Sequence, residues 1–536
     1  MKRTLIAIAA VVAAIAAFAV KKSPFDDRSF TPDQKLRYAE ALIDRFYVDE
    51  VDADTLVTEA IIAMLKTLDP HSAYSSPKET EELNQPLEGK FSGIGVQFSI
   101  VRDTVTVVQT TTGGPSEKVG VMAGDRIIYV NDSIFTHPKM VNSEVLKTLR
   151  GPKGSRVNLK IKRAGVPELI EFRITRDDIP IYSVDATYMA DPTTGYIRVT
   201  RFAEDTPNEV ARAIDRLKAQ GMRNLILDLQ DNTGGYLGAA QGVASLFLNE
   251  GDPIVMTRGR AQPSVTLDAD NSNKGIDRLV ILVNQYSASA SEIVSGAVQD
   301  HDRGVIVGRR TFGKGLVQRP FPFPDGSMVR LTTARYYTPS GRSIQKAYQK
   351  GHTEEYQLDM LSRYKSGELW SADSIKFDSN EKYQTLRNKR TVYGGGGIMP
   401  DHFVPADTSY YTPYYRDLMA KSVINTYITD YLDGHRKDLL KKYPTEDAFS
   451  ESFSTASMID GLTEAGEKAG VKKNEKQLAT SRPILEAILK GLLERDLYDN
   501  GSYMRAINPL SPEFRAALGI ITDADQYRRL LQPATE

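Results

Sequence analysis

A run of small and hydroxylated residues lies where an apolar strand meets a helix. Residues 278–284 (RLVILVN) are apolar enough for a strand covered on both faces, and apolar residues recur at helical spacing from Ala290 onward. This arrangement places Ser289 at the carboxyl edge of a sheet, where open α/β sheets bind ligands. The helix N-terminus adds unpaired N–H groups and a positive dipole, which suit a developing oxyanion. Ser289 is therefore a candidate nucleophile.

The same serine has a structural interpretation. Ser289 and Glu292 match a capping box, in which a serine stands three residues before a glutamate and satisfies the first N–H groups of a helix. Taken alone, this segment favours helix capping over catalysis.

A serine hydroxyl needs a base to act as a nucleophile. His301 lies about 18 Å from Ser289 along the same helix, at 1.5 Å per residue, so an intact helix keeps the two apart. Lys314 lies in the glycine-flanked turn FGKG after the next strand, where it can return to the same sheet edge. Serine–lysine pairs are an established variant of serine catalysis. The lysine must be neutral, so burial has to lower its pKa from about 10.4 toward neutrality.

A phosphate-binding motif around Lys314 and the histidine at position 71 offer other interpretations. Residues 308–314 fit G-x-x-x-x-G-K, the start of a phosphate-binding loop. Gly315 stands where such a loop needs serine or threonine, and prolines at 320, 322 and 324 exclude the helix that must follow. The phosphate-loop hypothesis therefore fails. His71 lies in the turn LDPHSAYSSP (68–77), and a lone histidine in a turn is expected to be structural.

The core that must position Ser289 and Lys314 is expected over 177–345. Strands and helices alternate there, as in α/β layer folds. The expected elements are a helix over 207–219, a strand over 224–230, the turn DNTGG (231–235), a helix over 236–248 and strands over 278–284 and 304–308. A core extension over 346–404 contains GGGGIMPD (394–401). The last region, 405–536, is mainly helical with mixed charge.

Residues 88–176 have a different character, with short alternating strands and glycine turns. Their order, with helices near 115–119 and 141–149 and the stretch MAGDRIIYVND, resembles a PDZ domain of the bacterial protease type. This resemblance implies that a loop presents N–H groups to a peptide carboxylate and that the peptide adds as an extra strand. The loop residues are Ser92, Gly93, Ile94, Gly95 and Val96. A small β-domain without a ligand is the alternative.

The N-terminus carries a targeting signal. An apolar run over 5–20 follows Lys2 and Arg3 and precedes another basic pair. Its length is short for a membrane span of about 20 residues and long for a signal core of roughly 7–15. We expect export, with 1–22 acting as a signal peptide or a membrane anchor. Residues 30–87 follow as an N-terminal helical region.

Composition narrows the classes of function. The 536 residues are 41% hydrophobic and 26% charged, which is typical of a globular chain of about three or four domains. The 68 Lys and Arg nearly balance the 69 Asp and Glu, so no net field favours nucleic acid. The absence of cysteine excludes disulfides, thiolate metal sites and a cysteine nucleophile. The sequence predicts a multidomain α/β protein with a layered core, a preceding or inserted PDZ-like domain, N-terminal helices and a mainly helical C-terminal region.

Three motifs in order, DLQDNTGG, NQYSASASEIVSGAVQD and TFGKGLVQ, lie behind the PDZ-like module. Together they resemble the carboxy-terminal processing peptidases, also called tail-specific proteases. The resemblance implies that Ser289 is the nucleophile, that Lys314 is the base and that Gln318 orients the lysine. It also implies an oxyanion hole and supporting positions. The oxyanion donors are Ala290 and either Gly234 or Gly235, and the supporting positions are Ser287, Ser291 and Asp300.

The sequence departs from the family's D-L-R-x-N-P-G-G motif at two positions. Gln230 replaces the arginine and Thr233 replaces the proline. We expect loss of the proline to loosen the turn that carries the oxyanion donor.

The expected function is a serine endopeptidase that cleaves exported proteins near their C-termini through an acyl-enzyme. The PDZ-like domain is expected to bind substrate tails or gate the site. The alternative is a non-catalytic PDZ-bearing scaffold on a degenerate peptidase core. We expect partners to be proteins or peptides with free C-termini, with no nucleic acid, no metal and no cofactor. The N-terminal segment is expected to associate with the inner membrane, in a periplasmic, membrane-anchored or secreted protein. The apolar faces of the 33–68 helices and the helical C-terminal region are candidate surfaces for a homo-oligomer, and ordinary core packing explains them as well.

Overall fold

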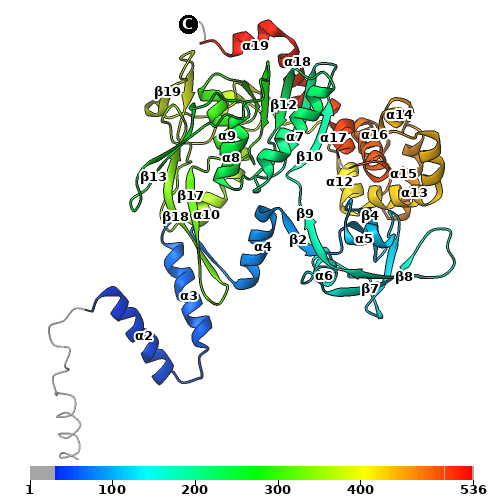
Figure 1. Cartoon of the computed structure of the whole chain (residues 1–536), viewed down its shortest axis with the longest axis horizontal. Helices are drawn as coiled ribbons and strands as arrows, with labels where there is room; N and C mark the ends of the chain where they lie inside the picture. The colour runs from blue at the N-terminus through cyan, green and yellow to red at the C-terminus, as the bar shows by residue number, and fades with distance from the viewer. Residues whose placement is uncertain (1–29, 500, 534–536) are drawn as a thin grey trace, which may run out of the picture. The chain divides into compact units, whose positions relative to one another are not determined.

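The computed structural model describes residues 30–499 and 501–533 (Figure 1). The chain divides into two compact units, Met1–Leu68 and Asp69–Glu536. Among the described residues, no helix is long and apolar enough to cross a membrane. The apolar run over 5–20 lies outside the described residues.

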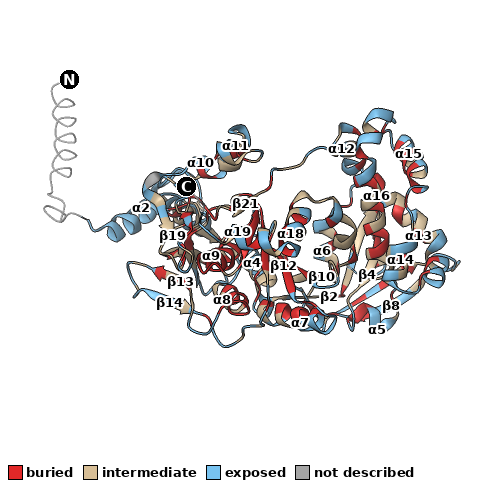
Figure 2. Cartoon of the chain, turned by 90° about the horizontal axis from the view of Figure 1, so that it is seen from above, coloured by how far each residue is buried: buried red, intermediate tan, exposed pale blue. Residues whose placement is uncertain are grey.

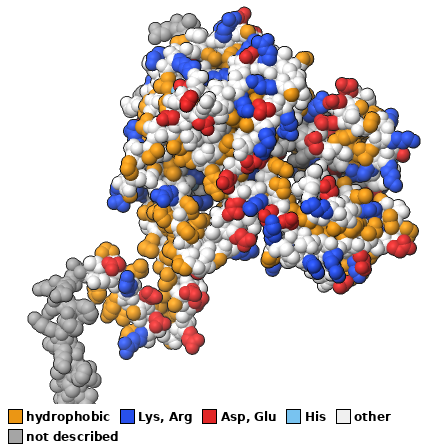
Figure 3. Space-filling view, in the orientation of Figure 1, with side chains coloured by type: hydrophobic (Ala, Val, Ile, Leu, Met, Phe, Trp, Pro, Cys, Tyr) orange, Lys and Arg blue, Asp and Glu red, His pale blue; other side chains and the backbone are white. Residues whose placement is uncertain are grey.

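The first unit contains the two helices that the sequence predicted. These are α2 (Pro32–Phe46) and α3 (Ala53–Lys66). Helix α2 begins with a proline at its first turn after Thr31, and α3 is capped by the Asp52 side chain, which accepts the Asp54 N–H. Large apolar side chains of both helices are exposed (Figure 3), among them Leu36, Leu42, Phe46 and Met64.

The α/β core expected over 177–345 is built on a six-stranded sheet with strand order β10-β11-β12-β15-β16-β21. Its strands are β10 (Val184–Met189), β11 (Thr194–Val199), β12 (Asn224–Asp228), β15 (Leu279–Val283), β16 (Val305–Gly308) and β21 (His402–Phe403). The β10–β11 pair is antiparallel and the remaining pairs are parallel. All residues of β12, β15 and β16 are buried, as expected for strands covered on both faces.

Helices cover both faces of this sheet. Helices α7 (Thr206–Ala219), α8 (Leu237–Ser245) and α9 (Ala290–Asp300) pack against one face, where Leu225 and Leu227 point. Helices α18 (Pro512–Thr522) and α19 (Ala524–Leu530) pack against the other face, where Ile226 points. Buried residues run along α9 and β12 (Figure 2). The last helices of the chain therefore complete the core.

A second sheet contains the hairpin that follows Lys314. Its path is β1-β18-β13-β14, and β17 pairs with β18. The strands are β1 (Ala73–Ser75), β13 (Pro253–Arg258), β14 (Val265–Asp268), β17 (Leu316–Pro322) and β18 (Met328–Tyr337). Through β1, the turn that contains His71 is joined to the β17–β18 hairpin.

The PDZ region forms its own sheet and core. Its strands are β3 (Val96–Val101), β4 (Thr104–Thr110), β5 (Arg126–Val130), β6 (Ser133–Ile134), β7 (Arg156–Lys162) and β8 (Ile170–Thr175), with helices α5 (Pro115–Val119) and α6 (Asn142–Leu149). Strand β3 lies at one end of the strand order and pairs with β4. The antiparallel pair β2 (Lys90–Gly93) and β9 (Asp177–Pro180) connects this region to the rest of the chain. Both predicted PDZ helices are confirmed.

The remaining elements lie between and after these sheets. They are α4 (Pro77–Glu88), α10 (Thr353–Gln357), α11 (Asp359–Lys365), β19 (Lys382–Gln384), β20 (Thr391–Tyr393), α12 (Pro413–Ala420), α13 (Val423–Lys442), α14 (Glu446–Ser452), α15 (Met458–Lys468), α16 (Glu475–Leu497) and α17 (Ser502–Ile507). Helices α12 to α16 share a hydrophobic cluster of their own. The predicted fold class, an α/β core with a PDZ-like domain and helical ends, is confirmed.

Candidate active site

Ser289 is the residue that precedes α9, at the carboxyl end of β15. It has φ 57° and ψ −112°, a conformation that residues with a side chain rarely adopt. Such strain persists only where surrounding contacts fix the backbone, and it is concentrated at functional sites. The strand-to-helix junction predicted from the sequence is therefore present, and its backbone at Ser289 is strained.

Glu292 holds Ser289 and the lysine segment together. Its Oε2 accepts the N–H of Ser289 at 2.8 Å and the N–H of Lys314 at 2.9 Å. Its Oε1 accepts the N–H of Gly313 at 2.7 Å and the Thr311 hydroxyl at 2.5 Å. Burial raises the pKa of this carboxyl, and the four hydrogen bonds oppose that rise. The sequence identified Glu292 only as a capping residue, but it also bridges the nucleophile and base segments.

Tyr336 makes a second bridge between the same segments. Its hydroxyl lies within hydrogen-bonding distance of the carbonyl oxygens of Ser289 and Lys314. The tyrosine comes from β18 and is 2% exposed, so the bridge lies inside the core. Sequence analysis missed this residue because it carries no motif of its own.

Lys314 has the electrostatic surroundings that a basic lysine needs. Its pKa is lowered to about 8, first by burial and then by the nearby charge of Arg330, whereas Glu292 and Asp69 act in the opposite direction. The expected lowering of the lysine pKa by burial is therefore present. Among the described residues, no hydrogen bond joins Ser289 Oγ to Lys314 Nζ.

Gln318 lies in β17, on the strand that Lys314 leads into. Its Nε2 donates to Leu316 O at 3.1 Å and to Thr332 Oγ1 at 3.3 Å. It makes no hydrogen bond to Lys314 in the described structure. Gln318 is therefore close to Lys314 in sequence, but its side chain is hydrogen-bonded to Thr332 of β18.

The glycine turn over 231–235 packs directly on Ser289. Gly234 has φ +102°, and a Cβ placed on it would lie 2.7 Å from Ser289 Cβ and 3.0 Å from Ala290 N. Its own N–H donates to Asn232 Oδ1 at 2.9 Å. The N–H groups of Ala290 and Gly235 have no hydrogen-bond partner within the described part of the chain. Of the two candidate glycines, Gly235 is the one with an open donor.

The turn is fastened to the nucleophile segment despite the threonine at position 233. The carbonyl oxygen of Asn232 accepts the Ala288 N–H at 3.0 Å and the Ser291 hydroxyl at 2.8 Å. The Asn232 amide donates to Val199 O at 2.8 Å. Ser287 adds a further tie, since its hydroxyl donates to Leu229 O at 2.7 Å. Ser287 and Ser291 thus support the turn through backbone acceptors.

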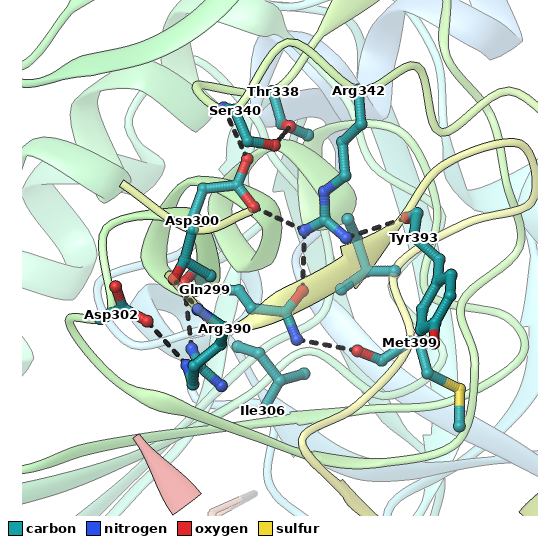
Figure 4. Close-up of polar contacts among 12 residues, drawn as sticks. Gln299, Asp300, Asp302, Ile306, Thr338, Ser340, Arg342, Arg390, Tyr393 and Met399 are labelled. Atoms are coloured by element: carbon teal, nitrogen blue, oxygen red, sulfur yellow. Dashed lines mark hydrogen bonds and ion pairs between the residues drawn. The ribbon is translucent and has the colours of Figure 1, made fainter. Parts of the chain in front are cut away.

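Asp300 lies at the opposite end of α9 from Ser289, in a buried polar network (Figure 4). Its Oδ1 accepts Arg342 Nη2 at 2.7 Å, and neither side chain has exposed surface. Its Oδ2 accepts the Ser340 N–H at 2.9 Å. Next to it, Gln299 Nε2 donates to Met399 O, and Arg390 pairs with Asp302. This network fixes the far end of the helix to the 394–401 segment.

The predicted PDZ loop over 92–96 contains the turn at Ile94 and Gly95, between strands β2 and β3. Gly95 has φ +73°, which favours glycine, and its carbonyl accepts the Thr111 N–H at 2.9 Å. The N–H groups of Ile94 and Gly95 have no partner among the residues that the structure describes. Ser92 carries a buried hydroxyl with no hydrogen-bond partner. Gly93 and Val96 belong to the pairings β2–β9 and β3–β4.

The two histidines that sequence analysis considered, His71 and His301, have other contacts. His71 Nε2 contacts the Tyr356 hydroxyl at 2.9 Å, and burial followed by the charge of Lys314 lowers the His71 pKa to about 4. His301 Nε2 contacts Pro253 O at 2.7 Å at the end of α9. His71 is therefore neutral near pH 7 and lies in the electrostatic neighbourhood of Lys314, which its sequence did not indicate.

Comparison with known proteins agrees with this architecture. Residues 193–354 match Peptidase family S41, residues 92–174 match a PDZ domain, and residues 414–499 match a family of unknown function (DUF8443). The chain is 37% identical over 305 residues to the carboxy-terminal-processing protease of Bartonella bacilliformis, covering 56% of this chain and 69% of that protein. It is 32% identical over 351 residues to the carboxy-terminal processing protease CtpB of Bacillus subtilis, covering 65% of this chain and 72% of that protein.

Among solved structures, the photosystem II D1 C-terminal processing protease is 31% identical, with 59% of this chain and 91% of that chain covered and a TM-score of 0.33. The PDZ domain of a carboxy-terminal protease from Vibrio cholerae is 27% identical over 17% of this chain and 97% of that chain, with a TM-score of 0.16. The sequence relationships to the two bacterial proteases span most of their length. This chain therefore belongs to the carboxy-terminal processing proteases of peptidase family S41, with a PDZ domain ahead of the peptidase region.

Proposed function

We propose that this protease cleaves exported proteins near their C-termini through an acyl-enzyme on Ser289, with Lys314 as the general base. The observation that carries the proposal is the Glu292 carboxylate, which binds the backbone N–H groups of both residues. The same carboxylate thereby holds the strained Ser289 and Lys314, the lysine with a lowered pKa.

In the first step, neutral Lys314 takes the proton of Ser289 Oγ as that oxygen bonds to the scissile carbonyl carbon. The carbonyl oxygen becomes an oxyanion, for which the open N–H groups of Ala290 and Gly235 are donors. The C–N bond then breaks, and Lys314 returns its proton to the leaving amine. Water, activated by the same lysine, then cleaves the ester and regenerates Ser289.

The proton transfer requires a change in the lysine side chain, since Ser289 Oγ and Lys314 Nζ share no hydrogen bond in the described structure. We propose that substrate binding brings the lysine amine within hydrogen-bonding distance of the serine hydroxyl. Gln318 is proposed to orient the lysine amine in the productive state.

The PDZ domain is proposed to bind the substrate tail. The open N–H groups of Ile94 and Gly95 suit a terminal carboxylate, and β3 lies at one end of the strand order, where a peptide can add as a further strand. Tethering the tail raises the effective concentration of the scissile bond at the core. The assignment of exported substrates rests on the predicted targeting segment over 1–22, which would place the enzyme outside the cytoplasm or on the inner membrane.

The test is covalent labelling of the purified protein with a fluorophosphonate, followed by peptide mapping. We expect the label on Ser289, with labelling and cleavage of a C-terminally tagged substrate lost in Ser289→Ala and Lys314→Ala. Cleavage by Lys314→Ala at the wild-type rate would refute the dyad. A protein that binds tails but neither labels nor cleaves would instead be the non-catalytic scaffold, an alternative favoured by the missing serine–lysine hydrogen bond.

A further inference from the structure

The turn at the start of the second unit, which contains Asp69 and Ser72, is hydrogen-bonded to the β17–β18 hairpin. Asp69 Oδ1 accepts the N–H groups of His71 at 2.9 Å and Ser72 at 3.1 Å, and its Oδ2 accepts the Ser72 hydroxyl at 2.6 Å. The same carboxylate reaches across to β18, where the Thr332 hydroxyl donates to Oδ1 at 2.8 Å. Ser72 Oγ in turn accepts the Thr332 N–H at 3.1 Å. Asp69 and Ser72 therefore hold Thr332 by both its backbone and its side chain.

The hydrogen bond to Asp69 determines whether the Thr332 hydroxyl donates to Gln318 or accepts from it. A threonine hydroxyl has one hydrogen, and a carboxylate can only accept. Because that hydrogen goes to Asp69, Thr332 Oγ1 can only accept from Gln318, whose Nε2 lies 3.3 Å away. The other Nε2 hydrogen goes to Leu316 O at 3.1 Å. Both hydrogens of the amide are thus committed, and Gln318 Oε1 is left as a free acceptor.

We propose that Asp69 is a positioning residue of the active site, which holds the Thr332 hydroxyl hydrogen and so fixes the Gln318 amide with its oxygen available to the Lys314 amine. The inference rests on the proposed function, in which Gln318 orients the lysine. Without the carboxylate, the Thr332 hydroxyl is free to donate to Gln318 Oε1. The amide then turns over and presents N–H donors to the lysine, whose lone pair must remain available for the serine proton.

Asp69 also acts on the lysine through its charge. The charged groups that face Lys314 are Arg330 from β18, Glu292 from α9 and Asp69, and the nearby His71 is neutral near pH 7. Burial raises the pKa of Asp69, but its hydrogen bonds outweigh that effect and keep the group ionised. Its negative charge favours the protonated lysine. Removing the charge lowers the pKa of Lys314, so more of the lysine is neutral at a given pH.

The orienting effect and the charge effect can be separated by two substitutions. Asp69→Ala removes both the charge and the acceptor oxygens, whereas Thr332→Val breaks the relay and leaves the charge of Asp69 in place. We expect kcat on a peptide substrate to fall about tenfold in each variant, which is the order expected for one lost hydrogen bond in the transition state. KM stays near the wild-type value, because both changes act on the orientation of the lysine. The acidic limb of the pH–rate profile moves to lower pH in Asp69→Ala only.

Controls keep the test informative if Asp69→Ala folds poorly. Thr332→Ser keeps the hydroxyl, and we expect it to restore most of the activity that Thr332→Val loses. Asp325→Asn, which changes an exposed carboxylate at the tip of the same hairpin, is the matched control and is expected to leave kcat and the pH profile unchanged. Thermal unfolding of every variant reports whether the fold is intact.

A double-variant comparison tests the route through Gln318. If Asp69 acts through that amide, Thr332→Val causes no further loss of kcat in a Gln318→Ala background. Wild-type kcat in Thr332→Val, or equal losses from it in both backgrounds, would overturn the inference. That failure is distinct from failure of the proposed function, since Ser289→Ala and Lys314→Ala would still abolish labelling and cleavage. Full activity in Lys314→Ala would instead remove the proposed function itself.

Discussion

At the scale of single residues, Glu292 joins the backbones of Ser289 and Lys314. Its buried carboxylate accepts four donors, two of which belong to Ser289 and Lys314. Glu292→Gln keeps the shape but replaces one acceptor oxygen with an NH2 group that faces N–H donors. Hydrogen bonds to a charged group contribute about 1.5–3 kcal/mol each, so we expect the free energy of unfolding to fall by about 2–4 kcal/mol.

We expect kcat of Glu292→Gln to fall by about a hundredfold or more, because a misplacement of about 1 Å in a catalytic group has this effect. Chemical denaturation and steady-state kinetics measure the two losses. Glu354→Gln, an exposed substitution, serves as the control and should change neither. A variant that retains wild-type kcat would show that the shared anchor is dispensable for catalysis.

With Lys314 as the proposed general base, we expect its pKa to set the pH dependence of the enzyme. Because only the neutral lysine accepts a proton, kcat/KM should rise with pH and level off above about pH 8, near the lysine pKa. Arg330 lowers that pKa through its positive charge. We therefore expect Arg330→Gln to raise the pKa of Lys314 and to move the acidic limb to higher pH, opposite to the shift expected for Asp69→Ala.

A pH–rate profile measured between pH 6 and about 10 checks this prediction, since that window brackets the lysine pKa. Arg319→Gln, an exposed arginine on the same hairpin, is the matched control. An acidic limb that stays in place in Arg330→Gln would assign the limb to a group other than Lys314.

At the scale of elements, α9 is fixed at both ends by buried carboxylates. Glu292 fixes its first turn, and Asp300 pairs with Arg342 at its last residue, where neither side chain is exposed. Asp300→Asn leaves the Arg342 charge buried without its partner. Breaking a buried pair in this way costs about 3–5 kcal/mol, so we expect unfolding at a correspondingly lower denaturant concentration.

The cause is tested by removing both charges. A double variant, Asp300→Leu with Arg342→Met, should recover part of the lost stability, because no unpaired charge remains in the core. If the double variant is as unstable as the sum of two single losses, packing and not charge accounts for the effect.

The PDZ loop supplies a second prediction at this scale. Gly95 has φ +73°, and a Cβ there would lie 3.0 Å from Ile179 Cδ1. Gly95→Ala should distort the loop and raise KM severalfold for substrates with a free C-terminal carboxylate. Amidated substrates, which lack that charge, should show little difference between the variant and the wild type.

Gly165→Ala is the matched control for this loop, since its φ is +78° and no atom lies within 4 Å of the added Cβ. Equal effects of both substitutions on KM would mean that general destabilisation of the domain, and not carboxylate binding, raises KM. The measurement is KM for paired peptides that differ only at the terminal group.

Local patterns predicted the elements around Ser289 because each depends on neighbours in the chain. The apolar run of β15 and the spacing from Ala290 suffice for a strand that meets a helix. The contact of Glu292 with Ser289 follows from the capping box, but its other three partners lie 19 to 22 positions downstream and could not be predicted in this way. The bond between Asp69 and Thr332 spans 263 positions, so no spacing rule reports it.

The same limit applies to the edge strand β21 and to helix α18, which covers one face of the sheet. Strand β21 pairs with β16 across 95 positions, as Val307 opposite His402 shows, although its two residues carry no strand pattern of their own. The helical character of α18 was predictable from its sequence, but its place on the sheet depends on which apolar face needs a cover. The Ser289–Lys314 assignment remains a prediction that labelling must test.

At the scale of the whole molecule, the chain's last helices complete the core that carries the active site. Phe514, Ala517 and Ile521 of α18 pack against the face of the sheet formed by Ile226, Val280 and Leu282. The Tyr527 hydroxyl accepts the Leu279 N–H at 3.1 Å, at the start of β15. The strand that leads to Ser289 therefore depends on residues more than two hundred positions away in sequence.

Phe514→Ala tests this dependence without touching the catalytic residues. Removing a 6% exposed phenylalanine from this face should lower the free energy of unfolding by about 3–5 kcal/mol, the range for large-to-small core substitutions. Because the strained Ser289 backbone is held only by its surroundings, we expect fluorophosphonate labelling to fade at a lower temperature than in the wild type. Arg515→Ala, on the exposed side of the same helix, is the control. Unchanged labelling and unfolding in Phe514→Ala would mean that α18 is a peripheral addition and that the sheet is stable without it.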